Sequence, residues 1–552
     1  MIRTEQWRPV GGIVLEPNAL TAVTTNENVV VAAGPGAGKT ELLAQRADFL
    51  LRTGQCPYPR RILAVSFKVD AARNLRERVR DRSGTRLSAR FESFTFQAFA
   101  KRLIDNFRPT LTGANALNPD YRIDRDARIA REQITLADLV PLALEIVAGN
   151  PYARGGIRQT YSHVFLDEFQ DCTNLQYELI EAAFGQSVAV LTAVGDTKQR
   201  IMAWAGALEG VMQTFAKNFS AHPLPLYQNF RSAPRLRRMQ NRMIERMDPE
   251  AVSSSEDLAG DGGIIDVLEF DTEYDEAEKV ADLIEGWLKV GTAAGDIAVL
   301  VRQQPHLVAA ALGAELTDRG IPFRNEQERQ DLAAEPAAAL VFNFIRVIAE
   351  DRQPEAYAEL MKVVNRSSAS EDGALRFDSQ LKRTLRETRA IVRDPKFKKD
   401  ELAVWTSLVY QFLQLISRPT LIALSSGYRQ GTRLDDIIQQ ALEAFGKELT
   451  VDGEPTEALK RLSGTDAIRF LTIHKCKGLE FEKVIVLGVE EELFWSSDST
   501  AVMSEFFVAI SRTKQHLVLT HTSHREWPTE PVNRWDEWRT PQRMLLGFAY
   551  ED

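Results

Sequence analysis

The sequence is poor in cysteine and has no excess of positive charge. Its 552 residues include three cysteines, Cys56, Cys172 and Cys476, which lie too far apart for a disulfide framework or a metal-ligand spacing. So few thiols are typical of a reducing compartment, and we expect a cytoplasmic protein. The formal net charge of −9 argues against a general basic coat for nucleic acid, although a local basic groove is compatible with it.

Long apolar segments are also missing. Residues 1–7 contain no apolar core of a signal peptide, and no apolar run is long enough to span a bilayer, so we expect no membrane partner. The composition, with 44% hydrophobic and 26% charged residues, is that of a globular protein. The length is sufficient for several domains with large cores.

A glycine-rich turn near the N-terminus joins a β-branched run to a helical pattern. The β-branched run that starts at Val29 predicts a strand, and residues 41–52 predict a helix. The turn between them has Ala33 in place of the usual first glycine and ends in Gly38-Lys39-Thr40. This context is what a phosphate-binding P-loop requires, because backbone N–H groups and a helix N-terminus then face the phosphates. Lys39 would reach the β- and γ-phosphates, and Thr40 would bind Mg²⁺. The alternative is a chance glycine-rich turn, which the flanking strand and helix make less attractive.

Strand-like and helix-like patterns alternate in two separate parts of the chain. Predicted strands lie at residues 62–67, 164–166, 188–194, 264–270, 297–301, 470–473, 484–487 and 517–520. Such alternation predicts an α/β fold with parallel sheets covered on both faces. Charged, helical sequence interrupts each part, so we expect two nucleotide-binding domains that each carry a helical insertion.

Two carboxylates follow the predicted strand at residues 164–166. In a P-loop protein, Asp167 would hold Mg²⁺ and Glu168 would orient or deprotonate the attacking water. Alone this pattern is weak, because strands often end in acidic turns, but together with the P-loop it indicates a site for hydrolysis of a nucleoside triphosphate.

The stretch Asp167-Glu168-Phe169-Gln170-Asp171 after a P-loop resembles the superfamily 1A helicases, the UvrD/PcrA/Rep group. Further segments resemble this group's motifs in the same order. They are residues 194–207 for motif III, 228–232 for motif IV, 472–481 for motif V and 508–512 for motif VI. The resemblance implies two RecA-like P-loop domains and an ATP-dependent DNA translocase or helicase that moves 3′→5′ on single-stranded or tailed DNA, with ATP and Mg²⁺ as cofactors.

The resemblance also implies a division into four domains. We expect a RecA-like domain 1A at residues 1–100 and 151–213, with a small helical insertion 1B at 101–150. A second RecA-like domain, 2A, is expected at 214–350 and 463–552, with a helical insertion 2B at 351–462. Both insertions are shorter than in processive members of the group.

In the group, the ATP site draws on both RecA-like domains. The resemblance implies that Gln199 senses the γ-phosphate and that Arg231 and Arg512 approach it when the domains close. Each arginine alone would suggest a surface salt bridge, but the surrounding motifs favour phosphate contact. The expected nucleotide contacts are Gly34, Gly36, Ala37, Gly38, Lys39, Thr40, Glu41, Phe230, Gly478 and Glu480.

For the DNA strand, the resemblance implies aromatic stacking and backbone contacts. The expected contacts are Phe67, Phe96, Gln97, Trp204 and His474. For Phe67 and Phe96, packing in the core is an equally open interpretation.

Several positions depart from the group's pattern. Ala19 stands where a glutamine usually reads adenine, Glu41 where an arginine often stacks on it, and Ala205 where an arginine helps link hydrolysis to DNA movement. These changes leave room for a helicase-like sensor of DNA ends or nucleotide, similar to the helicase-like subunit of the Gabija anti-phage system, with a nuclease partner. They also leave room for a scaffold that binds nucleotide without turnover.

A basic run lies in the second insertion. Nine Lys and Arg residues between Arg376 and Lys399 face only three acidic residues in the same stretch. Contact with duplex DNA or a partner is one interpretation, and a solvated helix face is the other.

Overall fold

The computed structural model describes residues 2–124, 127–201, 206–325, 332, 335–351, 353–364, 371–416, 418–425, 428, 432–463, 467–496, 498–528, 532 and 534–550. Its contacts divide the chain into two units. The first comprises Met1–Leu117, Ile123–Ile321 and Phe470–Asp552, and the second Asn118–Arg122 and Pro322–Arg469.

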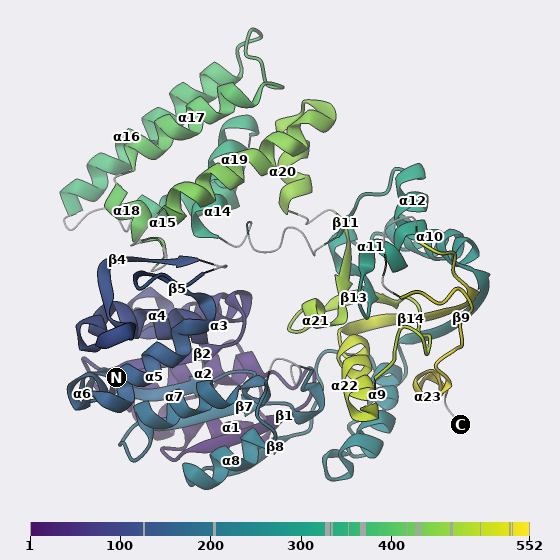
Figure 1. Cartoon of the computed structure of the whole chain (residues 1–552), viewed down its shortest axis with the longest axis horizontal. Coiled ribbons are helices and arrows are strands. Elements are labelled where there is room, and N and C mark those ends of the chain that lie inside the picture. The colour runs from purple at the N-terminus through teal and green to yellow at the C-terminus, as the bar shows by residue number, and fades with distance from the viewer. Residues whose placement is uncertain are drawn as a thin grey trace. The chain divides into compact units, whose positions relative to one another are not determined.

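The first unit contains two sheets, and the N-terminal one forms what we call the first lobe. Its strands lie in the order β3-β2-β6-β7-β1-β8, and neighbours pair in parallel. The strands are β1 (Val29–Ala33), β2 (Arg61–Ser66), β3 (Phe91–Thr95), β6 (Tyr161–Leu166), β7 (Val190–Gly195) and β8 (His222–Leu226). Helices lie on both faces of this sheet (Figure 1). They are α1 (Pro17–Thr24), α2 (Lys39–Thr53), α3 (Val69–Ser88), α4 (Phe96–Phe107), α5 (Leu139–Gly149), α6 (Pro151–Thr160), α7 (Asn174–Phe184) and α8 (Val211–Asn218).

The order of these strands brings distant residues to one edge of the sheet. β7 lies between β1 and β6, with Val31 in register with Val194 and Leu166 in register with Ala193. The carboxyl ends of β1, β6 and β7 therefore meet at the same edge, where α/β proteins bind their ligands. The P-loop, the acidic pair and the segment that contains Gln199 follow these three ends.

The second sheet, with its helices, forms the second lobe. From β12 onward its order is β12-β10-β13-β14-β9, and the pairs from β10 to β9 are parallel. The strands are β9 (Ile264–Thr272), β10 (Ile297–Val301), β12 (Ile468–Thr472), β13 (Phe481–Val486) and β14 (Thr513–His524). The helices are α9 (Pro234–Met247), α10 (Glu273–Lys289), α11 (Pro305–Val308), α12 (Ala310–Asp318), α21 (Ile473–Cys476), α22 (Ser499–Ile510) and α23 (Arg543–Leu546). The α/β class with two parallel sheets is thus confirmed.

The region expected to form a purely helical first insertion also contains strands. β4 (Leu117–Asp124) and β5 (Arg131–Thr135) form a separate two-stranded sheet. Tyr121 and Ile134 are both buried, while charged and polar neighbours alternate with them. This period of two marks a strand, but it is short and lies among many charges.

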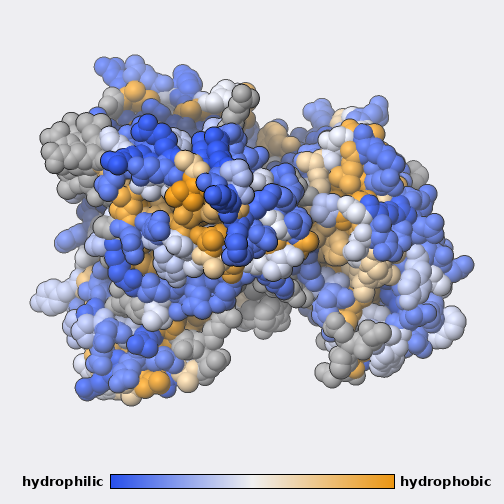
Figure 2. Space-filling view, turned by 90° about the horizontal axis from the view of Figure 1, so that it is seen from above, coloured by the Kyte–Doolittle hydropathy of each residue, from blue (hydrophilic) through white to orange (hydrophobic). Residues whose placement is uncertain are grey.

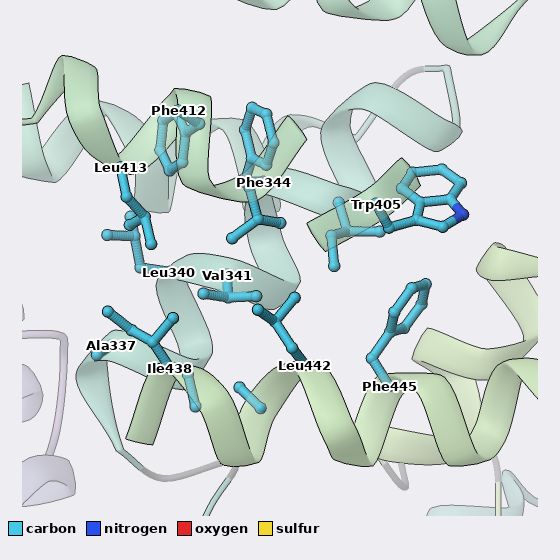
Figure 3. Close-up of a cluster of buried hydrophobic side chains, with 14 of the residues drawn as sticks. Ala337, Leu340, Val341, Phe344, Trp405, Phe412, Leu413, Ile438, Leu442 and Phe445 are labelled. Carbon is cyan, nitrogen blue, oxygen red and sulfur yellow. The ribbon is translucent and has the colours of Figure 1, made fainter. Parts of the chain in front are cut away.

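The second unit is largely helical, as expected of an insertion, but it begins earlier than residue 351. Its elements are β11 (Phe323–Asn325), α14 (Pro336–Ala349), α15 (Pro354–Val364), α16 (Glu371–Val392), α17 (Leu402–Leu415), α18 (Arg418–Ile422), α19 (Arg433–Asp452) and α20 (Pro455–Ser463). Figure 3 shows the core that α14 shares with α17 and α19. The rings of Phe344 and Phe412 stack there with centroids 4.1 Å apart. α14 therefore packs with the helices that follow it.

Two expectations from composition can be compared with the structure. All three cysteines lie in the described part of the chain, where they are buried and form no disulfide. Within the described residues, every helix is too short or too polar to cross a lipid bilayer. The face seen in Figure 2 is mainly hydrophilic, with smaller hydrophobic areas between charged and polar residues.

Candidate nucleotide site and nucleic-acid interface

The glycine-rich turn has the backbone that a phosphate-binding loop needs. Gly36 and Gly38 have φ angles of 70° and 75°, and Gly38 is the N-cap of α2. At Gly36 a side chain would also collide with its neighbour, because an added Cβ would lie 2.1 Å from Asn229 Oδ1. The Lys39 ammonium donates to the carbonyls of Ala33 at 3.1 Å and Gly34 at 3.4 Å. It is therefore folded over the loop, within reach of phosphates bound there.

The two acidic residues follow β6 at the same edge of the sheet. Glu168 has a left-handed backbone, with φ of 51°, which is uncommon outside glycine and is often found at functional sites. Its backbone N–H donates to Asp167 Oδ1 at 3.1 Å, and its Oε2 accepts from Gln170 Nε2 at 2.7 Å. The pair is therefore held in one arrangement.

The charges around this pair separate the two carboxylates. Burial and the neighbouring Glu168 carboxylate raise the pKa of Asp167, against the opposing charge of Lys39. Burial also acts to raise the pKa of Glu168, but Lys39, Lys477, the Gln170 amide and Arg512 together lower it. Glu168 is thus the carboxylate that stays ionised, while the Asp167 carboxylate would be stabilised by a cation.

The donor set fits Mg²⁺ bound together with a nucleotide. Mg²⁺ prefers hard oxygen ligands and is usually held by one or two protein oxygens plus phosphates. The Thr40 hydroxyl and the Asp167 carboxylate are such ligands. Within the described residues, no group of three or more His, Cys, Asp or Glu side chains could hold a metal ion. A site completed by phosphates agrees with this.

Gln199 and the two predicted arginines meet between the two lobes. Gln199 is buried, and its Nε2 donates to Asp196 Oδ2 at 2.8 Å. Its Oε1 accepts from Arg512 Nη2 at 2.6 Å. Arg231 Nη1 donates to the carbonyl of Ser511 at 3.1 Å, next to Arg512. Burial, together with the Arg231 charge, lowers the pKa of Arg512 to about 10.

A second set of contacts joins the lobes and was given no role in the sequence analysis. The Lys477 ammonium, which is buried, bonds to the carboxylate of Asp171 and to the carbonyl of Gln199, the latter at 2.7 Å. In the opposite direction, Lys68 Nζ donates to the carbonyls of Lys477 at 2.9 Å and His474 at 3.2 Å. Each lobe thus contributes one lysine that forms hydrogen bonds with the other lobe. Asp171 and Lys477 lie inside the motif-like stretches 167–171 and 472–481, and this position was the feature of the sequence that could have pointed to them.

Two sequence families together match most of the chain. The UvrD-like helicase C-terminal domain matches residues 224–386 and 420–524, and the family described as an AAA domain matches residues 17–205. The chain belongs to the UvrD-like helicases of superfamily 1A. The prediction of this family from the motifs is thereby confirmed.

Individual relatives agree with this assignment. The chain is 25% identical to DNA helicase II of Escherichia coli (strain K12), over 90% of this chain and 83% of that protein. It is 25% identical to the ATP-dependent DNA helicase PcrA of Leuconostoc citreum, over 96% of this chain and 84% of the relative. It is 23% identical to PcrA of Bacillus subtilis (strain 168), over 91% of this chain and 82% of that protein.

At the predicted adenine contacts, the side chains of this UvrD-like chain differ from the group's pattern. Glu41 is held by Arg82 Nε at 2.8 Å and Gln45 Nε2 at 2.7 Å. Burial acts to raise the pKa of Glu41, but these hydrogen bonds and the charge of Arg82 lower it. Ala19 is buried, whereas Phe230 is 67% exposed and free to stack on a base. The residues predicted to face the base therefore offer stacking and few hydrogen-bonding groups.

The second lobe holds the remaining predicted nucleotide contacts. Glu480 accepts from Arg231 Nε at 2.9 Å and pairs with Lys514 at 3.4 Å. Gly478 has a φ of 87° in the turn between α21 and β13. Glu480 therefore orients Arg231, and its own contact with nucleotide stays a prediction.

The predicted DNA contacts are in different environments. Phe96 is 1% exposed and lies 5.2 Å, centroid to centroid, from Phe67, so the packing interpretation is favoured for Phe96. Gln97 is exposed. His474 Nε2 lies 3.3 Å from the carbonyl of Ile201, and burial lowers its pKa against the opposing charge of Glu505. Trp204, with Met202 and Ala205, lies outside the described residues.

The basic run in the second unit is largely neutralised by acids. Lys382 pairs with Asp378 and Arg383 with Glu387 along α16. Arg393, Lys398 and Lys399 pair with Asp351, Glu401 and Glu454. Asp351, Glu401 and Glu454 lie outside the stretch from Arg376 to Lys399, so the count of acidic residues in that stretch did not include them. The contacts therefore favour a solvated helix face over a duplex-binding surface.

Proposed function

We propose that this UvrD-like chain is an ATP-dependent motor that moves 3′→5′ along single-stranded DNA and unwinds tailed duplexes. One observation carries the proposal, namely the meeting of Gln199, Arg231 and Arg512 beside a P-loop. Gln199 follows the first sheet, whereas Arg512 follows α22 of the second lobe. Hydrolysis of a nucleotide bound here would therefore change the contacts that both lobes make with it.

Each side chain has a defined part in the proposed reaction. Mg²⁺, bound by Thr40 and Asp167, would neutralise charge on the phosphates. Lys39 would exchange its two carbonyl acceptors for phosphate oxygens. Glu168, which stays ionised and has a fixed backbone, would accept a hydrogen bond from the attacking water and take up its proton.

The arginines would complete the site. Arg512 presents a planar guanidinium, and its donors are already aimed by Gln199 and by the carbonyl of Val508 at 3.0 Å. Arg231 is aimed by Glu480. Fixed cationic donors of this kind stabilise the charge of phosphoryl transfer without reorganising during the reaction.

Coupling to DNA would follow from the same contacts. Lys68 ties the end of β2 to α21, which carries His474, a proposed strand contact. When the γ-phosphate leaves, the arginines lose a ligand shared with Lys39, and the lobes can separate. Alternation between closed and open lobes would change the spacing of the strand contacts that each lobe carries.

The test is the ATPase rate with and without single-stranded DNA. We expect DNA to stimulate hydrolysis in the wild type, and Lys39→Ala and Glu168→Gln to abolish it. Lys289→Ala, at an exposed lysine at the end of α10, is the matched control and should retain the wild-type rate. Absence of turnover with every nucleic acid would overturn the motor proposal.

The adenine end of the site favours a second candidate function. Glu41 is held in ion pairs and Ala19 replaces a base-reading side chain, so nucleotide binding could serve sensing. The chain would then be a helicase-like sensor of DNA ends in an anti-phage complex, beside a nuclease partner in the cytoplasm. Strand displacement on a tailed duplex separates the two functions. Unwinding supports the motor, whereas DNA-stimulated hydrolysis without unwinding, together with a co-purifying nuclease, supports the sensor.

A further inference from the structure

An exposed tryptophan lies on a firmly held loop of the second lobe. Trp495, in the loop between β13 and α22, is 56% exposed. The two residues before it, Leu493 and Phe494, are buried, and the Phe494 ring packs edge-on against Phe506. Arg302 Nη1 donates to the carbonyls of Leu493 at 2.8 Å and of Trp495 at 2.5 Å. The backbone of Trp495 is thus fixed, while its indole faces solvent.

The same arginine links this loop to a proposed DNA contact. Arg302 Nε donates to Glu505 Oε2 at 2.5 Å, and Glu505 Oε1 lies 3.8 Å from His474 Nε2. Glu505 belongs to α22, which packs against α21, the helix that carries His474. Arg302 and Glu505 therefore connect the Trp495 backbone to His474.

We propose that Trp495 is a stacking contact for a base of single-stranded DNA, placed beyond His474 along the strand. An indole offers a large flat surface, and its stacking on bases is tolerant of sequence. The guanidinium carbon of Arg534 lies over the ring, 5.9 Å from its centre, so a cation stands at one face of the indole and a base would stack on the other. The inference rests on the proposed function, because it requires that the chain bind single-stranded DNA.

Apart from Arg302, which is paired with Glu505, and Arg534, which lies over the ring, the charged residues near Trp495 in sequence are acidic and favour stacking over phosphate contact. Glu491 and Glu492 precede it in the same loop, and Asp498 follows it. Acidic neighbours disfavour a phosphate, whereas an uncharged base face tolerates them. The contribution of Trp495 to DNA affinity should therefore require that a base be present, whichever base it is, and should change little with salt concentration.

The chain offers a matched control. Trp538 is more exposed, at 75%, and lies in the same lobe, where its ring packs edge-on against His524 at 5.2 Å. It belongs to the C-terminal segment that pairs with the end of β14. Its substitution removes an equally large exposed ring but leaves the loop held by Arg302 intact.

The experiment measures affinity for a labelled oligo(dT) strand by fluorescence anisotropy. We expect Trp495→Ala to weaken binding about 5- to 150-fold, the range for loss of one stacked base. Trp495→Phe should retain most of the affinity, and Trp538→Ala should bind as the wild type does. The salt dependence of binding should be the same for the wild type and Trp495→Ala. The circular dichroism spectra of Trp495→Ala and the wild type should coincide, as a check of folding.

A strand with abasic sites supplies the decisive arm. If Trp495 stacks on a base, Trp495→Ala and the wild type should bind the abasic strand with nearly equal affinity. Wild-type affinity of Trp495→Ala for oligo(dT), or an equal loss on abasic DNA, would overturn the inference and leave the motor proposal standing. If the wild type itself binds no single-stranded DNA, both proposals fail.

Discussion

Gln199 and Arg512 are joined by a buried hydrogen bond in which Arg512 Nη2 donates to Gln199 Oε1 at 2.6 Å. The two residues come from different lobes of the first unit. Gln199 is held by Asp196, and Arg512 is held by the carbonyl of Val508. Burial disfavours the cationic form of Arg512. The hydrogen bond to Gln199 holds this arginine where the negative charge of a bound γ-phosphate would stabilise the cation.

Arg512→Ala should therefore remove transition-state stabilisation while leaving nucleotide binding largely in place. We expect kcat for ATP to fall about 10³-fold, as for the loss of an arginine that contacts the transferred phosphoryl group. KM for ATP should change only a few-fold. Arg512→Lys should not restore the rate, because a lysine cannot bond Gln199 and Val508 with one planar fork.

The partner in this bond supplies the control. Gln199→Ala should lower kcat less than Arg512→Ala, and the double variant should resemble Arg512→Ala alone, because the two residues act as a unit. Arg319→Ala, at an arginine that directly follows α12 and pairs with Asp282 and Glu315, should keep wild-type kinetics. Fully additive effects of Gln199→Ala and Arg512→Ala would contradict a shared role.

The ion pair between Lys477 and Asp171 leads to a prediction about stability. Both side chains are buried, and burial raises the pKa of Asp171 against the opposing charge of Lys477. Lys477→Ala would leave a buried carboxylate without its cation, which typically costs about 3–5 kcal/mol. We expect a lower urea midpoint for unfolding of the first unit. Adding Asp171→Ala should recover part of the loss, and a double variant less stable than Lys477→Ala would contradict this account.

The glycine-rich turn and the place of the acidic pair at the end of a strand could be predicted because both depend on local sequence. A strand, two glycines with positive φ and a lysine lie within the eleven residues from Val29 to Lys39, and Asp167 and Glu168 directly follow a strand. The family motifs added Gln199, Arg231 and Arg512. In each of these cases the informative residues are close together along the chain.

The contacts between the lobes could not be predicted in the same way. Lys68 and Lys477 are about four hundred residues apart, and their hydrogen bonds depend on how two sheets meet. Burial of Phe96 likewise depends on packing that no local pattern reveals. The sequence shows that Glu41 departs from the group's pattern, but its ion pair with Arg82 depends on how α2 and α3 pack in the fold.

The base end of the nucleotide site should discriminate poorly between purines. A site rejects a wrong base strongly only when it offers groups that hydrogen-bond the right one. Here Ala19 has no such group, Glu41 is engaged by Arg82 and Gln45, and Phe230 can stack on either purine. We expect kcat/KM for ATP and GTP to differ by less than about tenfold. A preference for ATP above a hundredfold would show that other groups read the base.

His163 should make the first lobe sensitive to acid. It is buried in β6, where its Nδ1 lies 3.0 Å from Ser162 Oγ. Burial, with a contribution from the Arg46 charge, lowers its pKa to about 3, compared with about 6.5 in an unfolded chain. Between these values the unfolded chain binds a proton that the folded chain does not, so stability falls as the pH is lowered through this range.

The expected size of this effect is about 1.4 kcal/mol for each pH unit below 6.5. Urea unfolding at pH 6.5 and pH 5 should therefore show a loss about 2 kcal/mol larger for the wild type than for His163→Gln, whose amide can still bond Ser162 but does not titrate. Other groups titrate equally in both proteins, so the difference isolates His163. Parallel pH profiles for the two proteins would mean that protons reach His163 in the folded state, which is incompatible with its place inside the sheet.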